Sequence, residues 1–283
     1  MIQFLKYTYL SLIFSGLLLV IGFVSIFLYG FNYSIDFVGG ATAGFVIDTQ
    51  SEQPMKRYIQ KNFPTATTQK SGNSFLVKEK NITKENAQKI AQQIKGVRLG
   101  SFETISPSVS QENILKTITA FAIAAICILL YVAYSFRSFR YALAAIIAMF
   151  HDTILLMGAW SLLGKFFGAQ FDILFVTAML IIMSFSVHDT IVIFDKLKEE
   201  EGLGRYGSLE EKINTALTLT IIRSINTSIT SILVLAALVI LGGSATRWFS
   251  ISLLIGMFLG TYSSSFIAAP TYYFLTRFFK KRV

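Results

Sequence analysis

Two His-Asp-Thr tripeptides lie inside long apolar stretches, at His151-Asp152-Thr153 and at His188-Asp189-Thr190. An ionised side chain at the centre of a membrane helix costs about 2.5–3.5 kcal/mol on insertion scales, so it usually faces a bundle interior or water. Carboxylates and imidazoles in such places can bind and release protons. A third ionisable group, Arg223, lies in a later apolar stretch and carries the charge that a carboxylate would pair with.

The repeated His-Asp pair also suggests a metal site, because two imidazoles and two carboxylates from neighbouring helices form a plausible ligand set. Adjacent residues on a helix point about 100° apart, so one pair alone does not clasp an ion, and proton binding is the favoured interpretation. The sequence has no Gly-x-Ser-x-Gly elbow and no Gly-x-x-x-x-Gly-Lys-Ser/Thr phosphate loop. We therefore expect no enzyme activity, no metal and no cofactor.

The composition places these residues in a membrane protein. Of the 283 residues, 53% are hydrophobic and 14% are charged, against about 25% charged in soluble domains. The single cysteine, Cys127, excludes an internal disulfide. No basic run interleaved with aromatic residues accompanies the net charge of +9, so we attribute that charge to membrane topology and expect no nucleic-acid partner.

Six apolar stretches reach the length of about 20 residues that a helix needs to cross the hydrocarbon core. They cover residues 9–30, 114–134, 141–163, 171–194, 217–241 and 248–276. The first is too long for a signal-peptide core and has no small-residue cleavage site, so we expect an uncleaved anchor. The fold class is therefore an α-helical integral membrane protein: helix 1 in residues 1–30, an extracytoplasmic domain in 31–113, and helices 2–6 in 114–283.

Basic residues predict the orientation, because cytoplasmic loops retain Lys and Arg. With a cytoplasmic N-terminus, the cytoplasmic side holds Lys6, Arg137, Arg140, Lys196, Lys198, Arg205, Lys212, Arg277, Lys280, Lys281 and Arg282. The two short outer loops then hold only Lys165 and Arg247. We therefore expect a multi-pass protein with both termini in the cytoplasm.

This topology places Asp189 and Arg223 at similar depth, in the cytoplasmic thirds of two consecutive helices. They can form a fixed ion pair, or a proton site in which movement of Arg223 lets Asp189 take up a proton. The residues alone leave both interpretations open. Along the Arg223 helix, a polar stripe turned away from lipid is formed by Asn226, Thr227, Thr230 and Ser231.

Residues 31–113 have the pattern of a small α+β domain. Strands are predicted at 43–49, 65–70, 74–79 and 97–105, with a turn at 71–73. Helices are predicted at 52–63 and from the capping residue Thr83 to about Lys95. The order βαββαβ predicts a ferredoxin-like arrangement, which brings the two ends of the domain together.

The last apolar stretch has small residues at every fourth position, namely Ser252, Gly256, Gly260 and Ser264. A face of this kind lets two membrane helices approach closely. We favour packing against another helix of this chain, with contact to a partner subunit as the alternative.

Several segments resemble, in order, those of the SecF family of protein-export membrane subunits. After the first helix, Ser34-Ile35-Asp36-Phe37-Val38-Gly39-Gly40 is similar to the family's Gly-Ile-Asp-Phe-x-Gly-Gly, near the outer membrane face. The stretch 186–196 is similar to the family's Ser-x-Asn-Asp-Ser-Ile-Val-Val-x-Asp-Arg. Further similarity lies at 106–110, 134–137, 148–152, 241–243 and 260–264. The resemblance covers nearly the whole chain.

The resemblance implies an accessory subunit of the Sec pathway in the bacterial cytoplasmic membrane, of the resistance-nodulation-division type, that pairs with SecD beside the SecYEG channel. It implies that a proton gradient drives outer-domain movements that help preproteins across. By position, Asp189 and Arg223 match the family's proton-pathway acid and arginine, and Asp152 matches an in-membrane acid. His188 replaces the family's usual Asn, and adds either a second titratable group or a neutral hydrogen-bonding partner.

Two other functions remain open. One is a static scaffold that holds partners around the channel, with Asp189 and Arg223 as a fixed pair. The other is a half-transporter that exports hydrophobic small molecules. The small size of the outer domain favours protein export over the half-transporter.

Overall fold

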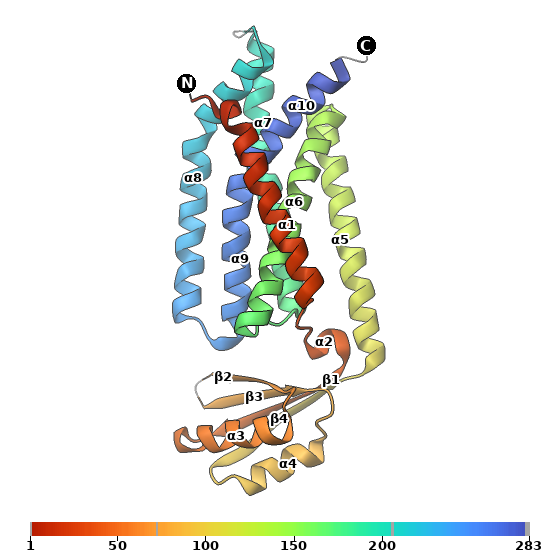
Figure 1. Ribbon diagram of the computed structural model, residues 1–283, viewed down its shortest axis with the longest axis vertical. Coiled ribbons are helices and arrows are strands. Elements are labelled where there is room, and N and C mark those ends of the chain that lie inside the picture. The colour runs from red at the N-terminus through yellow and green to blue at the C-terminus, as the bar shows by residue number, and fades with distance from the viewer. Residues whose placement is uncertain (1, 72, 205–206, 281–283) are drawn as a thin grey trace.

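The computed structural model describes residues 2–71, 73–204 and 207–280. Figure 1 shows a long helical bundle with a small sheet domain at one end. Four residues used in the predictions lie outside this description: Gly72 of the expected turn, and the basic residues Arg205, Lys281 and Arg282.

Six helices in the described ranges are long and apolar enough to cross a membrane, which confirms the predicted number of spans. They are α1 (Thr8–Tyr29), α5 (Pro107–Phe136), α6 (Phe139–Phe167), α7 (Ile173–Leu203), α8 (Leu209–Leu241) and a last helix made of α9 (Ser244–Ser263) and α10 (Ala269–Lys280). A short 3-10 turn, η1 (Phe4–Tyr7), precedes α1. Several helices, α5 and α7 most of all, extend well past the apolar stretches that predicted them.

Local capping residues fix where these helices begin and end. Ser106 accepts from the N–H of Val109 with Pro107 in the first turn of α5, and Asp172 accepts from the N–H of Phe175 at the start of α7. Ser208 and Glu211 form a capping box at the start of α8. These side chains satisfy N–H groups that have no partner inside the helix.

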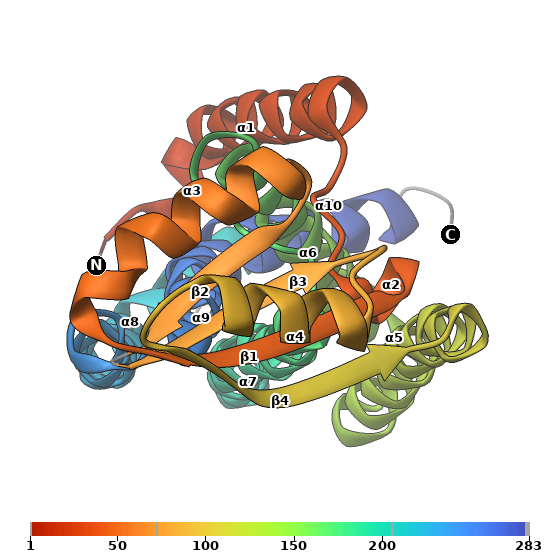
Figure 2. The same ribbon diagram turned by 90° about the horizontal axis from the view of Figure 1, so that it is seen from below.

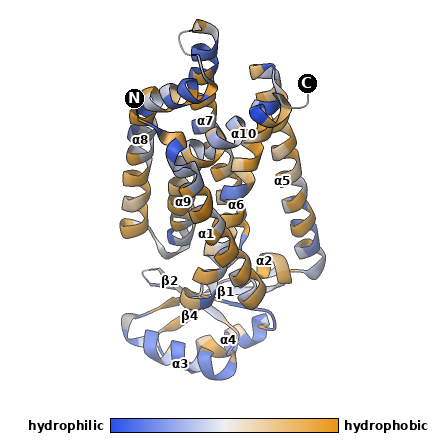
Figure 3. Ribbon diagram, turned by 45° about the horizontal axis from the view of Figure 1, so that its top comes forward, coloured by the Kyte–Doolittle hydropathy of each residue, from blue (hydrophilic) through white to orange (hydrophobic). Residues whose placement is uncertain are grey.

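The helices form a buried centre and an exposed periphery. In the most apolar window, 56% of the residues of α6 and of α7 are buried, against 6% in α5 and 11% in α8. Figure 3 shows apolar residues along most of the bundle and polar residues on the helices of the sheet domain. The peripheral helices therefore offer their apolar faces to lipid or to a partner.

Helix α1 packs on α6 through small residues. The Cα of Gly158 lies so close to Gly22 that a Cβ at position 158 would overlap the Cα of Gly22. Nearby, the Ser25 hydroxyl donates to the Ser161 hydroxyl at 3.0 Å. Small residues thus allow the two backbones to approach closely, as in other membrane helix pairs.

The last helix changes direction at a π-helical turn, η3 (Ser264–Ala268), between α9 and α10 (Figure 1). Pro270 follows two residues later. A proline inside a helix has no N–H and its ring crowds the carbonyl four residues earlier, which favours a local change of helical geometry. At the far end of this bend, the hydroxyls of Tyr272 and Tyr141 donate to the Glu201 carboxylate at 3.1 and 2.9 Å, which ties α10 to α6 and α7.

The sheet domain follows the predicted order of strands and helices. It consists of β1 (Gly40–Ile47), α3 (Glu52–Asn62), β2 (Thr67–Ser71), β3 (Ser74–Glu79), α4 (Lys84–Gln93) and β4 (Val97–Ile105), preceded by a one-turn helix, α2 (Ile35–Val38). The sheet has the order β2-β3-β1-β4 with every neighbouring pair antiparallel. Figure 2 shows α3 and α4 side by side over one face of the sheet, the face turned away from the bundle. The predicted bounds differ from these by up to three residues.

Two glycines make the tight junction between α2 and β1. Gly39 has φ 76° and Gly40 has φ 142°, in the range that L residues rarely adopt. A Cβ on Gly40 would lie 2.9 Å from the Cα of Lys80. The Gly-Gly step of the family-like segment is therefore required by backbone geometry, because a side chain at position 40 would collide with the residue that follows β3.

Replacing Gly158 by Ala should separate α1 from α6. The added methyl overlaps the Gly22 backbone, and overpacking of this kind costs about 1–3 kcal/mol. Gly16→Ala on α1 is the matched control, since nothing lies within 4 Å of the Cβ that it adds, and Ala is the better helix former by up to about 1 kcal/mol. Thermal unfolding in detergent should show a lower midpoint for Gly158→Ala only; equal midpoints would contradict the close α1–α6 contact.

Candidate functional site

Asp189 lies at a junction of three helical elements and is held by hydroxyl groups. Its side chain comes from α7 and the residue is 9% exposed. The Ser224 hydroxyl of α8 donates to Oδ1 at 2.6 Å, and the Ser264 hydroxyl, at the start of the π turn, donates to Oδ2. Both carboxylate oxygens are therefore satisfied by neutral donors.

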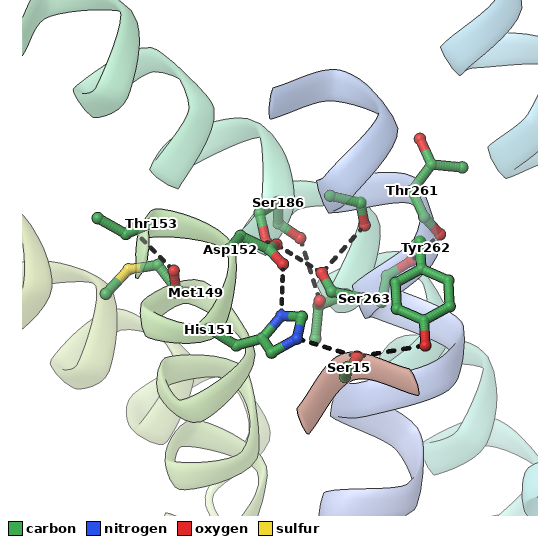
Figure 4. A network of polar contacts seen from close by, with 12 residues as sticks. Ser15, Met149, His151, Asp152, Thr153, Ser186, Thr261, Tyr262 and Ser263 are labelled. Carbon is green, nitrogen blue, oxygen red and sulfur yellow. Dashed lines mark hydrogen bonds and ion pairs between the residues drawn. The ribbon is translucent and has the colours of Figure 1, made fainter. Parts of the chain in front are cut away.

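Asp152 of α6 has a similar environment deeper in the bundle, and it is 1% exposed. Ser186 of α7 and Ser263 of α9 donate to its Oδ2 at 2.6 and 2.5 Å. Its Oδ1 lies 2.9 Å from Nδ1 of His151. Figure 4 shows these side chains converging from α6, α7 and α9.

His151 continues this network to α1. Its Nε2 lies 3.1 Å from the Ser15 hydroxyl, which donates to the Tyr262 hydroxyl at 3.2 Å (Figure 4). Tyr262 in turn donates to the carbonyl oxygen of Ser11 at 3.0 Å. The network thus runs without interruption from the Asp152 carboxylate to the backbone of α1.

The predicted pairing of Asp189 with Arg223 is not formed. Between these two described residues no ion pair within 4.0 Å exists, and the Arg223 side chain is exposed on the surface of the chain. Arg223 and Ser224 are adjacent on α8, so their side chains point about 100° apart, and it is Ser224 that faces Asp189. Arg223 thus lies next to the residue that bonds to Asp189, but on another face of α8.

Four other predicted residues also lie on the outer surface of α7 and α8. His188 is exposed, whereas Asp189 beside it is buried. Asn226, Thr227 and Thr230 of the predicted polar stripe are exposed too, while Ser224 and Ser228 face inward. The two His-Asp pairs therefore do not converge, because His151 lies inside the bundle and His188 outside it.

At the sheet end of the bundle, Asp36 joins three elements. Its Oδ2 accepts from the Ser34 hydroxyl at 2.8 Å and from the N–H of Ile173, the first residue of α7, at 3.4 Å. Its carbonyl oxygen accepts from Asn113 of α5 at 2.9 Å. Asp36 therefore connects the segment before β1 to the starts of α5 and α7.

A second acid, Asp172, lies at the same end of α7. Burial raises the pKa of its carboxyl above the ordinary value of 3.8; the N–H of Phe175 and the charge of Lys78 on β3 oppose this shift, and the negative charge of Asp36 adds to it. The carboxylates of Asp36 and Asp172 and the ammonium group of Lys78 therefore act on one another electrostatically where the sheet domain adjoins the bundle.

Comparison with known proteins identifies the family. The family model described as "Protein export membrane protein SecD/SecF, C-terminal" matches residues 84–277. A protein translocase subunit SecF from Thermobaculum terrenum is 37% identical over 95% of this chain and 92% of its own length. The chain belongs to the SecF family. SecF of Pseudomonas aeruginosa is 33% identical over 89% of this chain and 84% of its own.

Longer proteins contain a segment similar to this SecF-family chain. Protein translocase subunit SecDF of Thermus thermophilus is 33% identical over 86% of this chain, which spans 34% of that protein. The crystal structure of SecDF from Thermus thermophilus, a translocon-associated membrane protein, matches with a TM-score of 0.84 and 29% identity, over 98% of this chain and 39% of that one. A structure of SecDF in a super-membrane-facing form matches with a TM-score of 0.70.

The small-residue face of α9 packs within this chain, against α7. A Cβ on Gly256 would overlap the side chain of Ile182, and one on Gly260 would lie 3.3 Å from the Cα of Ser186. Ser264, the last member of the stripe, donates instead to Asp189. The stripe therefore both brings α9 close to α7 and ends at the candidate site.

Four hydroxyl groups of the site were not predicted. Ser224 and Ser263 donate to the carboxylates, and Ser15 and Tyr262 continue the network from His151. A hydroxyl inside a membrane helix usually bonds to a carbonyl of its own helix, as Ser263 also does with Gly260, so its presence in the sequence does not reveal a partner on another helix. A run of three serines at 263–265 in an apolar helix was the available signal.

Replacing Asp172 by Asn should flatten the dependence of stability on pH. Because the folded protein binds this proton more tightly than the unfolded chain, the stabilisation is complete below the ordinary pKa and is lost as the pH rises through the raised pKa. Asn keeps the helix cap but carries no charge. Between about pH 4 and pH 7, the thermal midpoint in detergent should fall less for Asp172→Asn than for the unchanged protein, and the exposed control Asp48→Asn should leave the fall unchanged.

Proposed function

We propose that this SecF-family chain acts in protein translocation as the proton-binding subunit of an export machine, with Asp189 as its proton-binding carboxylate. Family membership supports the role in translocation. The hydroxyl environment of Asp189 is the observation that supports proton binding. The chain has no proposed enzyme activity of its own; it works by changing shape.

Hydroxyl groups suit both protonation states of a carboxyl group. A serine donates one hydrogen to the ionised form, and its oxygen accepts the hydrogen of the neutral acid. Ser224 and Ser264 can therefore keep Asp189 hydrogen-bonded before and after it binds a proton. An arginine in contact would instead hold the carboxyl in its ionised form. The hydroxyl environment of Asp189 therefore favours a proton site over a static ion pair. A proton site, in turn, favours an active subunit over a scaffold.

The exposed polar face of α8 fits a partner within the membrane. In the chain without a partner, this face exposes Arg223, Asn226, Thr227 and Thr230. His188 of α7 is exposed as well. Lipid is a poor neighbour for such groups, and intramembrane charges usually pair inside a bundle. SecDF relatives carry a longer chain around the matching segment. We therefore propose that SecD covers this face and supplies a carboxylate for Arg223.

The arrangement of the ends fits the proposed location in the bacterial cytoplasmic membrane. The start of α1 and the end of α10 lie at one end of the bundle, and the sheet domain lies at the other (Figure 1). With the termini in the cytoplasm, the sheet domain stands outside, where a preprotein leaves the SecYEG channel. One proton crossing 100 mV releases about 2.3 kcal/mol, so a few protons suffice to bias a domain movement.

Asp189→Asn should abolish the gradient-dependent part of secretion. Asn keeps the size of Asp189 and can bond to both serines, donating to one and accepting from the other, but it cannot bind the transported proton. Secretion of a preprotein into inverted vesicles that contain the SecDF and SecYEG complexes should fall to the level seen without a proton gradient. Asp195→Asn is the matched control, because Asp195 is an exposed acid on the same helix.

Two results would contradict the proposal. Full gradient-dependent secretion by Asp189→Asn would favour the static scaffold. Recovery of the chain with an efflux apparatus, without SecD or the channel, would favour the half-transporter of hydrophobic molecules.

A further inference from the structure

The directions of the hydrogen bonds around His151 fix where one of its hydrogens lies. A carbonyl oxygen has no hydrogen, so the Tyr262 hydroxyl must donate to the Ser11 carbonyl. The oxygen of Tyr262 can then only accept, and Ser15 uses its single hydrogen to donate to it. Ser15 is left as an acceptor for His151. Nε2 of His151 therefore carries a hydrogen.

A second hydrogen lies between His151 and Asp152. Nδ1 and Oδ1 are 2.9 Å apart, and without a hydrogen between them two lone pairs would face each other in a buried site. That hydrogen makes the pair either an imidazolium with a carboxylate or a neutral imidazole with a carboxylic acid. Both forms are neutral overall. Both also hold one more proton than a neutral imidazole beside a carboxylate.

The surroundings of the pair supply hydroxyls and no compensating charge. Among the described contacts, α1 contributes Ser15, α7 contributes Ser186, and α9 contributes Ser263, with Tyr262 reached through Ser15. The histidine is 7% exposed and the aspartate 1%. Asp189 lies one turn beyond Ser186 on α7, but its own bonds go to Ser224 and Ser264. Release of the proton would leave an uncompensated charge in the bundle.

The two carboxylates share one structural element. Ser263 donates to Asp152 and the next residue, Ser264, donates to Asp189. This step is the entry to the π turn η3, a form of helix that occurs often at functional sites. A change in either carboxylate therefore acts on the same peptide unit.

We propose that His151 and Asp152 form a second proton-binding site, coupled to Asp189 through the Ser263-Ser264 step. The inference rests on the proposed function in assigning Asp189 its proton, but the second site stands on its own contacts. One proton binds at the Nδ1–Oδ1 contact and leaves from it. Proton binding at one site then acts on the other through this shared peptide unit.

Infrared difference spectroscopy of the SecDF complex in nanodiscs, titrated with acid and base, tests this inference through the carbonyl band of protonated carboxyl groups and the ring bands of histidine. We expect one event that Asp189→Asn removes and a separate event that Asp152→Asn removes. The imidazole component of the second event should disappear in His151→Gln, whose amide still fills the site. In Asp152→Asn the Asp189 titration should sharpen to a single one-proton step.

The serine step has a matched control on the same helix. Ser263→Ala removes the donor to Asp152 and should alter both events, whereas Ser252→Ala should alter neither, because Ser252 is equally buried but bonds to the Phe249 carbonyl of its own helix. Thermal unfolding confirms that each variant is folded.

The outcomes separate the two proposals. A single event that persists in Asp152→Asn and disappears in Asp189→Asn would overturn the second site while leaving the proposed function intact. A single event that disappears in Asp152→Asn and persists in Asp189→Asn would support the second site and count against Asp189 as the proton-binding group. Two events that stay unchanged in Ser263→Ala would overturn the coupling.

Discussion

Burial of two carboxylates among hydroxyl groups is the constraint around which the bundle is organised. Asp152 and Asp189 would each cost several kcal/mol if left without partners in an apolar interior. Four serines, from α7, α8 and the last helix, donate to these carboxylates. A serine reaches a short distance only, so these helices must approach closely at this level. Small residues at 256 and 260 allow that approach, and the close contact of α1 with α6 brings Ser15 to His151.

The bend in the last helix follows from the same constraint. Adjacent side chains on an α-helix point about 100° apart. Ser263 and Ser264 accordingly donate to carboxylates on two different helices. The π turn that begins at Ser264, with Pro270 behind it, redirects the chain at this point. Beyond the bend, α10 is held to α6 and α7 through Glu201. The bend is thus fixed at both ends, and any movement there acts on both carboxylates.

The sequence predicted the elements well and the contacts poorly. Apolar length alone gave six spans, and alternation with turn residues gave the order of the sheet domain, because those signals come from the whole length of each element. Asp189 and Asp152 were found because a charge in an apolar stretch is rare. The Asp189–Arg223 pair was wrong because depth along a helix does not specify which face a residue occupies; Ser224, one position on, has that face. The bond between Ser263 and Asp152 joins residues 111 apart in sequence, and no local pattern records it.

The proposed proton sites can act on the sheet domain because one rigid element spans the distance. Helix α7 is continuous from Ile173 to Leu203, and its 17 residues from Ile173 to Asp189 extend about 25 Å. At the sheet end of the bundle, the first N–H of α7 donates to Asp36, whose own carbonyl is bonded to α5 and whose segment turns through Gly39 and Gly40 into the sheet. A tilt of α7 at Asp189 would therefore move the base of the domain. Asp36 and the Gly-Gly step would transmit such a movement, since only a short turn separates the helix from the strand.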